Sequence, residues 1–318
     1  MRELALIAAF GLITALVPLA VSSGFALNFV IMVLYAALLG QAWNILAGFG
    51  GQFSFGHAAF FGTGAYVAAV LQIRFGWNAW LALSAAVALG AAVGAFVGTL
   101  SFRYGLRGSY FALVTLAFAE VFRILANTFE FTGAGVGLMI PLANSAEKMQ
   151  FATPGGFLHL ILSFTLLSFF ATWWLKYSRF GAWLQAVRDN EDSAAALGVN
   201  VFRVKLGAIT ISAALSACGG VFYVQYFHYI DPHIAYGPAV SVEALLAPIV
   251  GGLGTLFGPL LGAAMLHLLG ELTRYLTGDA PGVNQIVYGI VLVLMITYMP
   301  RGIIGAITAP RARKAGRA

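Results

Sequence analysis

The sequence predicts an all-α polytopic membrane protein with about ten transmembrane helices. Of its 318 residues, 61% are hydrophobic and only 9% are charged, and the mean hydropathy is +0.90. A soluble domain carries about 25% charged residues. Water cannot solvate a surface of this composition, so most of it must face lipid or other helices.

Apolar segments recur along the whole chain. A spanning helix needs about 20 mainly apolar residues, and ten segments approach that length. They are, in order, 4–21, 26–46, 53–72, 79–100, 109–128, 158–175, 205–228, 239–256, 259–276 and 283–300. The third and the eighth are glycine-rich, so each is expected to be either a complete span or a re-entrant segment covered by protein.

The first segment has a second interpretation. Arg2 supplies a minimal basic n-region, and Val21-Ser22-Ser23-Gly24 resembles a signal-peptide cleavage site. However, an apolar run of about 18 residues is longer than a usual h-region. A retained span is therefore favoured, with cleavage left open.

The basic residues indicate an even number of spans with both chain ends in the cytoplasm. If the first span starts inside, 13 of the 17 Lys and Arg residues fall in inside segments, including five in the tail over 301–318. Only Arg74 and Lys148 fall outside. Cytoplasmic segments are enriched in Lys and Arg. The scattered charge is not the footprint of a nucleic-acid-binding protein.

Two loops are longer than the rest. The 129–157 loop falls outside and divides the chain into five and five spans, which predicts two inverted halves. The glycine-rich segments 56–66 and 251–262 are weak support for this symmetry. The 176–204 loop falls inside and contains a predicted helix from Trp183 to Leu197 that stops at Gly198.

Small residues predict close packing within the membrane. Gly90, Gly94 and Gly98 repeat at intervals of four, which places them on one helix face that a neighbouring helix can approach. Cys218, the only cysteine, lies in an apolar run and is expected to be a small packing residue.

Charged and polar residues inside spans are candidates for a pathway. Glu120 and Arg123 are three residues apart and are expected to form an ion pair facing the bundle interior, or a pathway group. Glu243 lies near the outer end of the eighth segment, where it is either a pathway residue or an interfacial one. His57 is equally a pathway or a packing residue. The pathway candidates are Asn44, Gln52, His57, Glu120 and Glu243.

Signatures of catalysis and of cofactors are absent from the sequence. There is no G-x-x-x-x-G-K-[ST] loop for ATP, no G-x-S-x-G elbow and no H-E-x-x-H motif. The histidines share no metal-ligand spacing, so neither a metal nor a cofactor is expected in this chain.

The segment 186–198 mixes charges with a run of alanines and ends in glycine. Such a helix either caps the loop or docks into a groove on a soluble partner, where its charges set the register. The docking candidates are Arg188, Asp189, Asn190, Glu191, Asp192, Leu197 and Gly198.

Five segments, in order, resemble the permeases of high-affinity branched-chain amino acid ABC transporters, and the M type more than the H type. They are Trp43–Tyr66 (WNILAGFGGQFSFGHAAFFGTGAY), Gly108–Glu120 (GSYFALVTLAFAE), Ala186–Asn200 (AVRDNEDSAAALGVN), Val250–Gly262 (VGGLGTLFGPLLG) and Pro300–Gly302 (PRG). The third segment reads Glu-Asp-Ser-Ala where other importers begin Glu-Ala-Ala, which leaves its exact contacts open.

The resemblance implies a type II importer-like permease fold in a single domain, 1–318, in the bacterial inner membrane. It implies as partners a second related permease, two cytoplasmic ATPase subunits that bind the ATP, and an extracytoplasmic substrate-binding protein. The 186–200 segment would contact the ATPase. Relatives of the family carry branched-chain amino acids, urea, amides or aromatic acids. The rival interpretation is a self-sufficient secondary transporter or channel, which the docking loop disfavours.

Overall fold

The computed structural model describes residues 2–21, 23–143, 145–278, 282–299 and 301–308. The basic tail residues Arg311, Arg313, Lys314 and Arg317, and Pro300, therefore lie outside the described residues.

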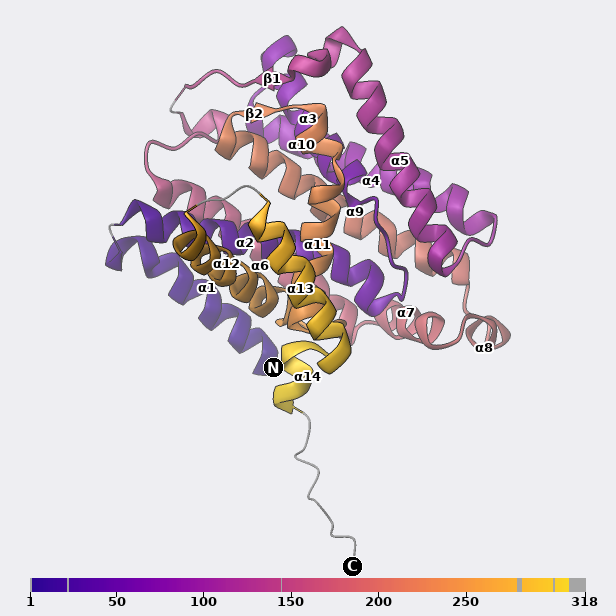
Figure 1. The fold of residues 1–318 in the computed structure, drawn as a ribbon. Helices are drawn as coiled ribbons and strands as arrows, with labels where there is room; N and C mark the ends of the chain where they lie inside the picture. Colours follow the sequence, from indigo (N-terminus) through magenta and orange to yellow (C-terminus); the bar gives the residue numbers. More distant parts are fainter. Residues whose placement is uncertain (1, 22, 144, 279–281, 300, 309–318) are drawn as a thin grey trace, which may run out of the picture.

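Helices make up almost all of the described chain (Figure 1). The long helices are α1 (Arg2–Ala20), α2 (Gly24–Asn44), α3 (His57–Phe75), α4 (Ala79–Arg103), α5 (Gly108–Thr128), α6 (Pro154–Tyr177), α9 (Val201–Phe227), α11 (Pro238–Gly251), α12 (Gly258–Thr277) and α13 (Val283–Tyr298). The short helices are α7 (Arg179–Asp189), α8 (Glu191–Ala196), α10 (Pro232–Tyr236) and α14 (Gly302–Thr308). Single turns are η1 (Ile45–Phe49), η2 (Glu130–Thr132), η3 (Ala134–Val136) and η4 (Ala146–Lys148).

Eight helical segments in the described residues are long and apolar enough to cross a membrane. They include α2 continued by η1, and α10 together with α11. The expected count of ten is therefore not confirmed. Helix α12 has 20 residues, but His267, Glu271 and Arg274 interrupt its apolar run. Helix α13 has 16 residues, fewer than the roughly 20 that cross the hydrocarbon core without bilayer thinning.

Two of the expected segments have different limits in the structure. Helix α3 begins at His57, so residues 53–56 of the expected span 53–72 are not helical. The expected span 239–256 ends as a helix at Gly251, and it is preceded by the separate short helix α10. Glycines cause the second difference, because Gly252 and Gly254 adopt positive φ angles of 138° and 68°.

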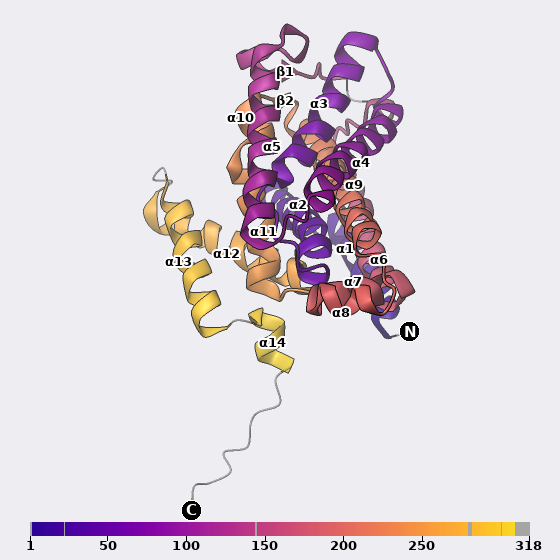
Figure 2. The same cartoon turned by 90° about the vertical axis from the view of Figure 1, so that its right-hand side faces the viewer.

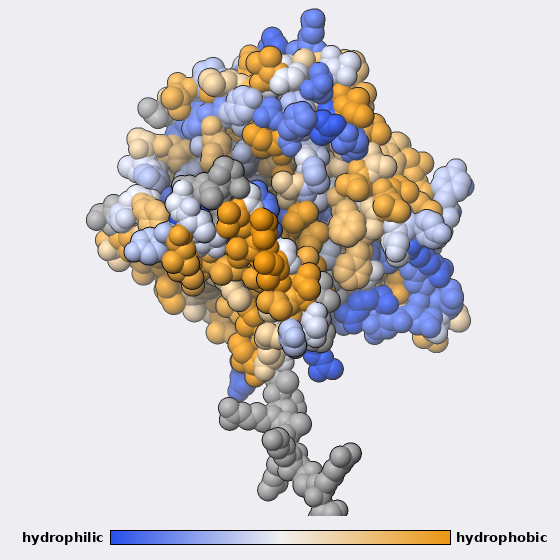
Figure 3. Space-filling model, in the orientation of Figure 1, coloured by the Kyte–Doolittle hydropathy of each residue, from blue (hydrophilic) through white to orange (hydrophobic). Residues whose placement is uncertain are grey.

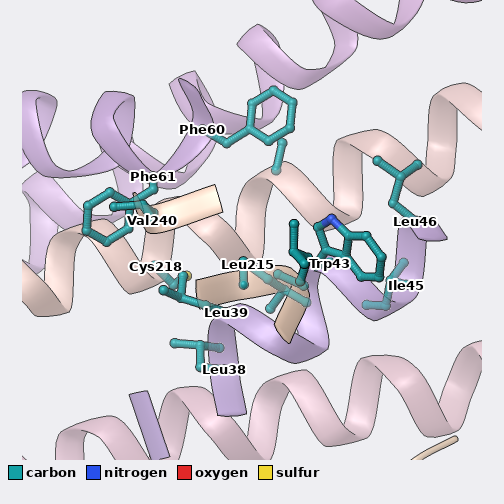
Figure 4. Packing of buried hydrophobic residues seen from close by; sticks show 14 of the residues in the cluster. Leu38, Leu39, Trp43, Ile45, Leu46, Phe60, Phe61, Leu215, Cys218 and Val240 are labelled. Atoms are coloured by element: carbon teal, nitrogen blue, oxygen red, sulfur yellow. The ribbon is translucent and has the colours of Figure 1, made fainter. Parts of the chain in front are cut away.

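Helix α9 lies at the centre of the bundle and packs against α3 and α4 through small residues. A β-carbon at Gly90 would lie 2.4 Å from Cβ of Ala217, and one at Gly94 would lie 2.3 Å from Cβ of Ala213. The predicted close-packing stripe is confirmed. Cys218 is buried beside Leu39 and Leu215 in the core, as Figure 4 shows, and is a packing residue.

The two ends of the bundle differ. Helices α7, α8 and α14 lie at the same end, as both ribbon views show (Figures 1 and 2). At the other end β1 (Leu138–Met139) pairs antiparallel with β2 (Tyr229–Ile230), which ties the 129–153 connection to the end of α9. In the space-filling view hydrophobic residues cover α13, and hydrophilic residues gather over α7 and α8 (Figure 3).

Candidate functional site

The segment predicted as one docking helix from Trp183 to Leu197 is two helices, α7 and α8, so that prediction is wrong in detail. Asn190 separates them, with an extended backbone at φ −160° and ψ 110°. Its side-chain oxygen accepts a hydrogen bond from the backbone N–H of Ser193 at 2.8 Å. Asparagine is a preferred N-cap because this bond satisfies an otherwise unpaired helix donor. Gly198, at φ +86°, ends the element as predicted.

The charged residues of this segment face two directions. Leu197 is 85% exposed, and the side chains of Asp189 and Asp192 are 69% and 87% exposed. The Glu191 side chain is only 14% exposed and turns toward the bundle. The exposed residues are therefore available to a partner, whereas Glu191 is engaged within the chain.

Glu191 joins α8 to two other elements. Its carboxylate pairs with the ammonium of Lys205 on α9, and it accepts from Nε of Arg107 at 2.9 Å. The Lys205 side chain is 4% exposed, and its ammonium lies 5.4 Å from the centre of the Phe102 ring at the end of α4. Because Arg107 is the residue before α5, this cluster ties α8 to the C-terminal end of α4 and to the N-terminal ends of α5 and α9. We call Glu191, Lys205 and Arg107 the carboxylate tie.

Arg188 makes the second connection, from α7 into the bundle. Its guanidinium donates to the carbonyl oxygen of Gly48 at 3.1 Å and to Asp189 at 2.9 Å. Its stem covers Gly51, where a β-carbon would lie 2.7 Å from Cγ of Arg188. Gly51 also has a φ of +67°, so only glycine fits there without strain. Arg188 therefore rests on the irregular segment 50–56 between η1 and α3.

Asn44, the last residue of α2, is hydrogen-bonded to the break between α11 and α12. Its side-chain oxygen accepts from the N–H of Gly254 at 2.8 Å, and its amide nitrogen donates to the carbonyl of Thr255 at 3.0 Å. Gln41, one turn earlier, donates to the carbonyl of Leu256 at 2.6 Å. Two amide side chains of α2 thus satisfy backbone groups of a non-helical segment inside the protein.

Glycines allow the backbones of η1 and of the start of α14 to contact the break between α11 and α12. A β-carbon at Gly48 would lie 2.5 Å from the nitrogen of Gly254, and one at Gly302 would lie 2.6 Å from Cα of Gly252. Helix α14 consequently starts against the same break. A hydroxyl also accepts a backbone hydrogen bond next to the start of each following helix, since Ser54 accepts from the N–H of Gly56 and Thr255 from that of Gly258. We call residues 44–56 and 251–258, with Arg188, the junction.

Gln52 is buried within the junction, and His57 is buried directly beside it. Gln52 donates to the carbonyl of Gly50 at 3.3 Å. The His57 Nε2 lies 2.9 Å from Oγ of Ser212, and its Nδ1 lies 3.2 Å from Oγ of Ser54. Because the Ser212 hydroxyl donates to the carbonyl of Ala42, His57 must donate through Nε2, and its neutral form is satisfied. This geometry favours the packing interpretation of His57.

The two glutamates predicted for the pathway lie away from the junction. Glu120 pairs with Arg123 at 2.8 Å, as expected, and Arg123 reaches Nδ1 of His233 at 3.4 Å. The expectation that this pair faces the bundle interior is wrong, because the Glu120 side chain is 49% exposed on the outer face of α5. Glu243 lines a cavity between α2, α11, α12 and α13.

Sequence reasoning brought Asn44 and Arg188 into the candidate set but missed their partners. The basic residues Arg107 and Lys205 were counted only as markers of orientation, although Lys205 lies in the first turns of a long apolar helix and a buried charge there needs a partner. In the part of the chain that the structure describes, no group of His, Cys, Asp or Glu side chains is arranged to hold a metal.

The fold and the junction define a multi-pass α-helical membrane protein. Hydrogen bonds of Arg188 and Asn44 connect the exposed helix α7 to two breaks, one between α2 and α3 and one between α11 and α12. Residues 25–296 match the family model described as the branched-chain amino acid transport system permease component. The chain belongs to this family, and is thus a permease component rather than an enzyme.

Curated relatives agree with this assignment. The chain is 30% identical to the high-affinity branched-chain amino acid transport system permease protein LivM of Salmonella typhimurium, over 95% of this chain and 75% of that protein. It is 25% identical to LivH of the same organism, over 85% of this chain and 91% of LivH. The ribose import permease protein RbsC of Escherichia coli is 26% identical, over 74% and 72%. No solved structure matches the chain.

Proposed function

We propose that this chain is one permease subunit of an ATP-driven importer in the bacterial inner membrane, working as a single domain. Its substrate would be a branched-chain amino acid, as the names of LivM and LivH indicate for those relatives. A second, related permease would complete the pathway, two ATPase subunits would bind α7 and α8, and a binding protein would deliver the solute on the other side. Both chain termini would then lie in the cytoplasm.

The connection through Arg188 is the observation that carries this proposal. In it, Asp189, Asp192 and Leu197 contact the ATPase, while Arg188 transmits the movement of α7 to the junction. Asn44 holds the junction together, and Gln52 and His57 brace it. Asn190 and Gly198 set where α8 begins and ends. Closure of the ATPase pair would thus move two helix breaks at once, which is a route to alternating access.

The outer face of α5 is proposed to line the pathway. An ion pair such as Glu120–Arg123 is costly against lipid, even where the bilayer thins around it. In the isolated chain this pair is exposed among apolar side chains, including Leu113, Leu116 and Ile124. A second permease covering this face would leave Glu120 beside a hydrated path.

Removing the Arg188 side chain tests the coupling. In the reconstituted importer with its ATPases and binding protein, Arg188→Ala should lower leucine uptake roughly tenfold, because a hydrogen bond from a charged donor contributes about 1.5–3 kcal/mol. Hydrolysis of ATP should persist, so that less solute moves per ATP. Arg179→Ala is the control, since Arg179 is exposed on the same helix. Normal uptake by Arg188→Ala, or equal losses in both variants, would contradict the coupling role.

A competition assay tests the substrate. With the cognate binding protein present, unlabelled leucine, isoleucine and valine should suppress uptake of labelled leucine, whereas urea, amides and aromatic acids should not. Suppression by one of these other solutes alone would reassign the substrate and leave the permease role intact.

A further inference from the structure

A cavity of about 340 Å³ lies between α2, α11, α12 and α13, away from the junction and the carboxylate tie. A second cavity of about 180 Å³ shares three of its side chains, those of His267, Arg274 and Tyr288. The inner walls of the larger cavity are aliphatic. They are formed by Ala36, Ala239, Val242, Leu246, Ala247, Ala263 and Leu266.

Glu243 supplies the uncompensated charge of this cavity. It makes no hydrogen bond or ion pair with any other residue that the structure describes. The titratable groups that interact with it electrostatically are the phenols of Tyr35, Tyr223 and Tyr288, which carry no charge at neutral pH. A carboxylate in a low-dielectric interior is stable only beside a cation or a proton.

The other ionisable groups of the lining already have partners. Arg274 pairs with Glu271 at 3.1 Å. His267 donates through Nδ1 to the carbonyl of Ala263 at 3.1 Å, which leaves Nε2 of the neutral ring as an acceptor. The charged side chains that line the two adjoining cavities are Glu243, Glu271 and Arg274, so their net formal charge is negative and favours a cation.

We infer that this cavity binds a small aliphatic primary ammonium group. Such a group has three N–H donors, and the cavity offers several acceptors besides the carboxylate, namely Nε2 of His267, the Gln285 amide oxygen and the Tyr288 hydroxyl. The aliphatic wall suits a short hydrocarbon chain. A bare metal ion fits poorly, because it needs several converging oxygen ligands.

This inference rests on the function proposed above only for the source of the ammonium group. In a permease the ammonium group would belong to the passing solute, and the cavity would place a solute-binding position inside one subunit, apart from the α5 face. Binding itself can be measured without transport, so the two proposals can fail separately.

The test uses the purified importer complex in nanodiscs, without its binding protein. Isobutylammonium chloride should raise the midpoint of thermal unfolding in a saturable manner, because a ligand that binds only the folded state stabilises it. Isobutanol at equal concentration should not. Glu243→Gln should weaken the apparent affinity for isobutylammonium by about tenfold or more, since a hydrogen bond to a charged group is lost.

Two controls keep the outcome decisive. Glu130→Gln removes an exposed carboxylate of η2 that does not line the cavity and should leave the affinity unchanged. Tetramethylammonium, which has the charge but no N–H, should bind the unaltered protein at least about tenfold more weakly than isobutylammonium does. This comparison needs no variant, so it tests the inference even if Glu243→Gln does not fold. Equal stabilisation by isobutanol, equal binding of tetramethylammonium, or full affinity in Glu243→Gln would overturn the inference. Coupling through Arg188 would be untouched by any of these results.

Discussion

At the scale of single residues, the carboxylate tie depends on one buried charge. Glu191→Gln would leave the ammonium of Lys205, which is 4% exposed, without its anionic partner. Breaking a buried ion pair by removing one partner costs roughly 3–5 kcal/mol. We therefore expect a lower thermal unfolding midpoint for the purified permease, measured by fluorescence-detected size exclusion, and weaker coupling of ATP hydrolysis to uptake.

The neighbouring residue provides the matched control for this prediction. Asp192 has the same charge and is the next residue in the chain. However, its side chain is 87% exposed, and its carboxylate comes no closer to Arg107 than 3.5 Å. Exposed ion pairs contribute about 0–1 kcal/mol, so Asp192→Asn should leave the midpoint unchanged. Adding Lys205→Met to Glu191→Gln should restore much of the lost stability. A double variant no more stable than Glu191→Gln would contradict the tie.

At the scale of elements, the contact between α4 and α9 requires glycine. Gly94→Ala should destabilise the protein by roughly 1–3 kcal/mol, because Cβ of Ala213 cannot move out of the way without shifting α9. Ala213→Gly in the same chain should restore the unfolding midpoint. Gly289→Ala is the control, since nothing lies within 4 Å of the added carbon. Equal effects of Gly94→Ala and Gly289→Ala would show that helix propensity, not packing, decides.

Elements were predictable where one physical rule acts alone. Apolar length placed most of the long helices to within a few residues, and the spacing of Gly90 and Gly94 located a helix contact. The prediction failed where local backbone chemistry competes with hydropathy. Asn190 splits a helix by capping the next one, and Gly252 ends α11 although the following residues are apolar. The partners of Arg188 and Asn44 are about 140 and 210 positions away in the chain, and no pattern in a single sequence reports such distances.

At the scale of the whole molecule, the exposed charges of α5 and the exposed helices α7 and α8 are proposed to contact different partners. Glu120 and Arg123 lie within α5, among exposed apolar residues. Helices α7 and α8 lie at one end of the bundle (Figure 2). On the proposed function, the chain would meet one partner within the membrane and another in water. An importer assembled from separate subunits requires this division, and a self-sufficient transporter has no need of it.

The proposed orientation of the chain can be measured directly. Leu197, beyond α8, is 85% exposed, and Met139, in β1 at the opposite end, is 71% exposed. The native Cys218 is buried and should not react, so single cysteines can be introduced without removing it. In intact spheroplasts a membrane-impermeant maleimide should label Met139→Cys, whereas Leu197→Cys should react only in inside-out vesicles. The physical reason is the bias of Lys and Arg toward the end that carries α7 and α8. Labelling of Leu197→Cys from outside would invert the topology and place the ATPase contact on the wrong side of the membrane.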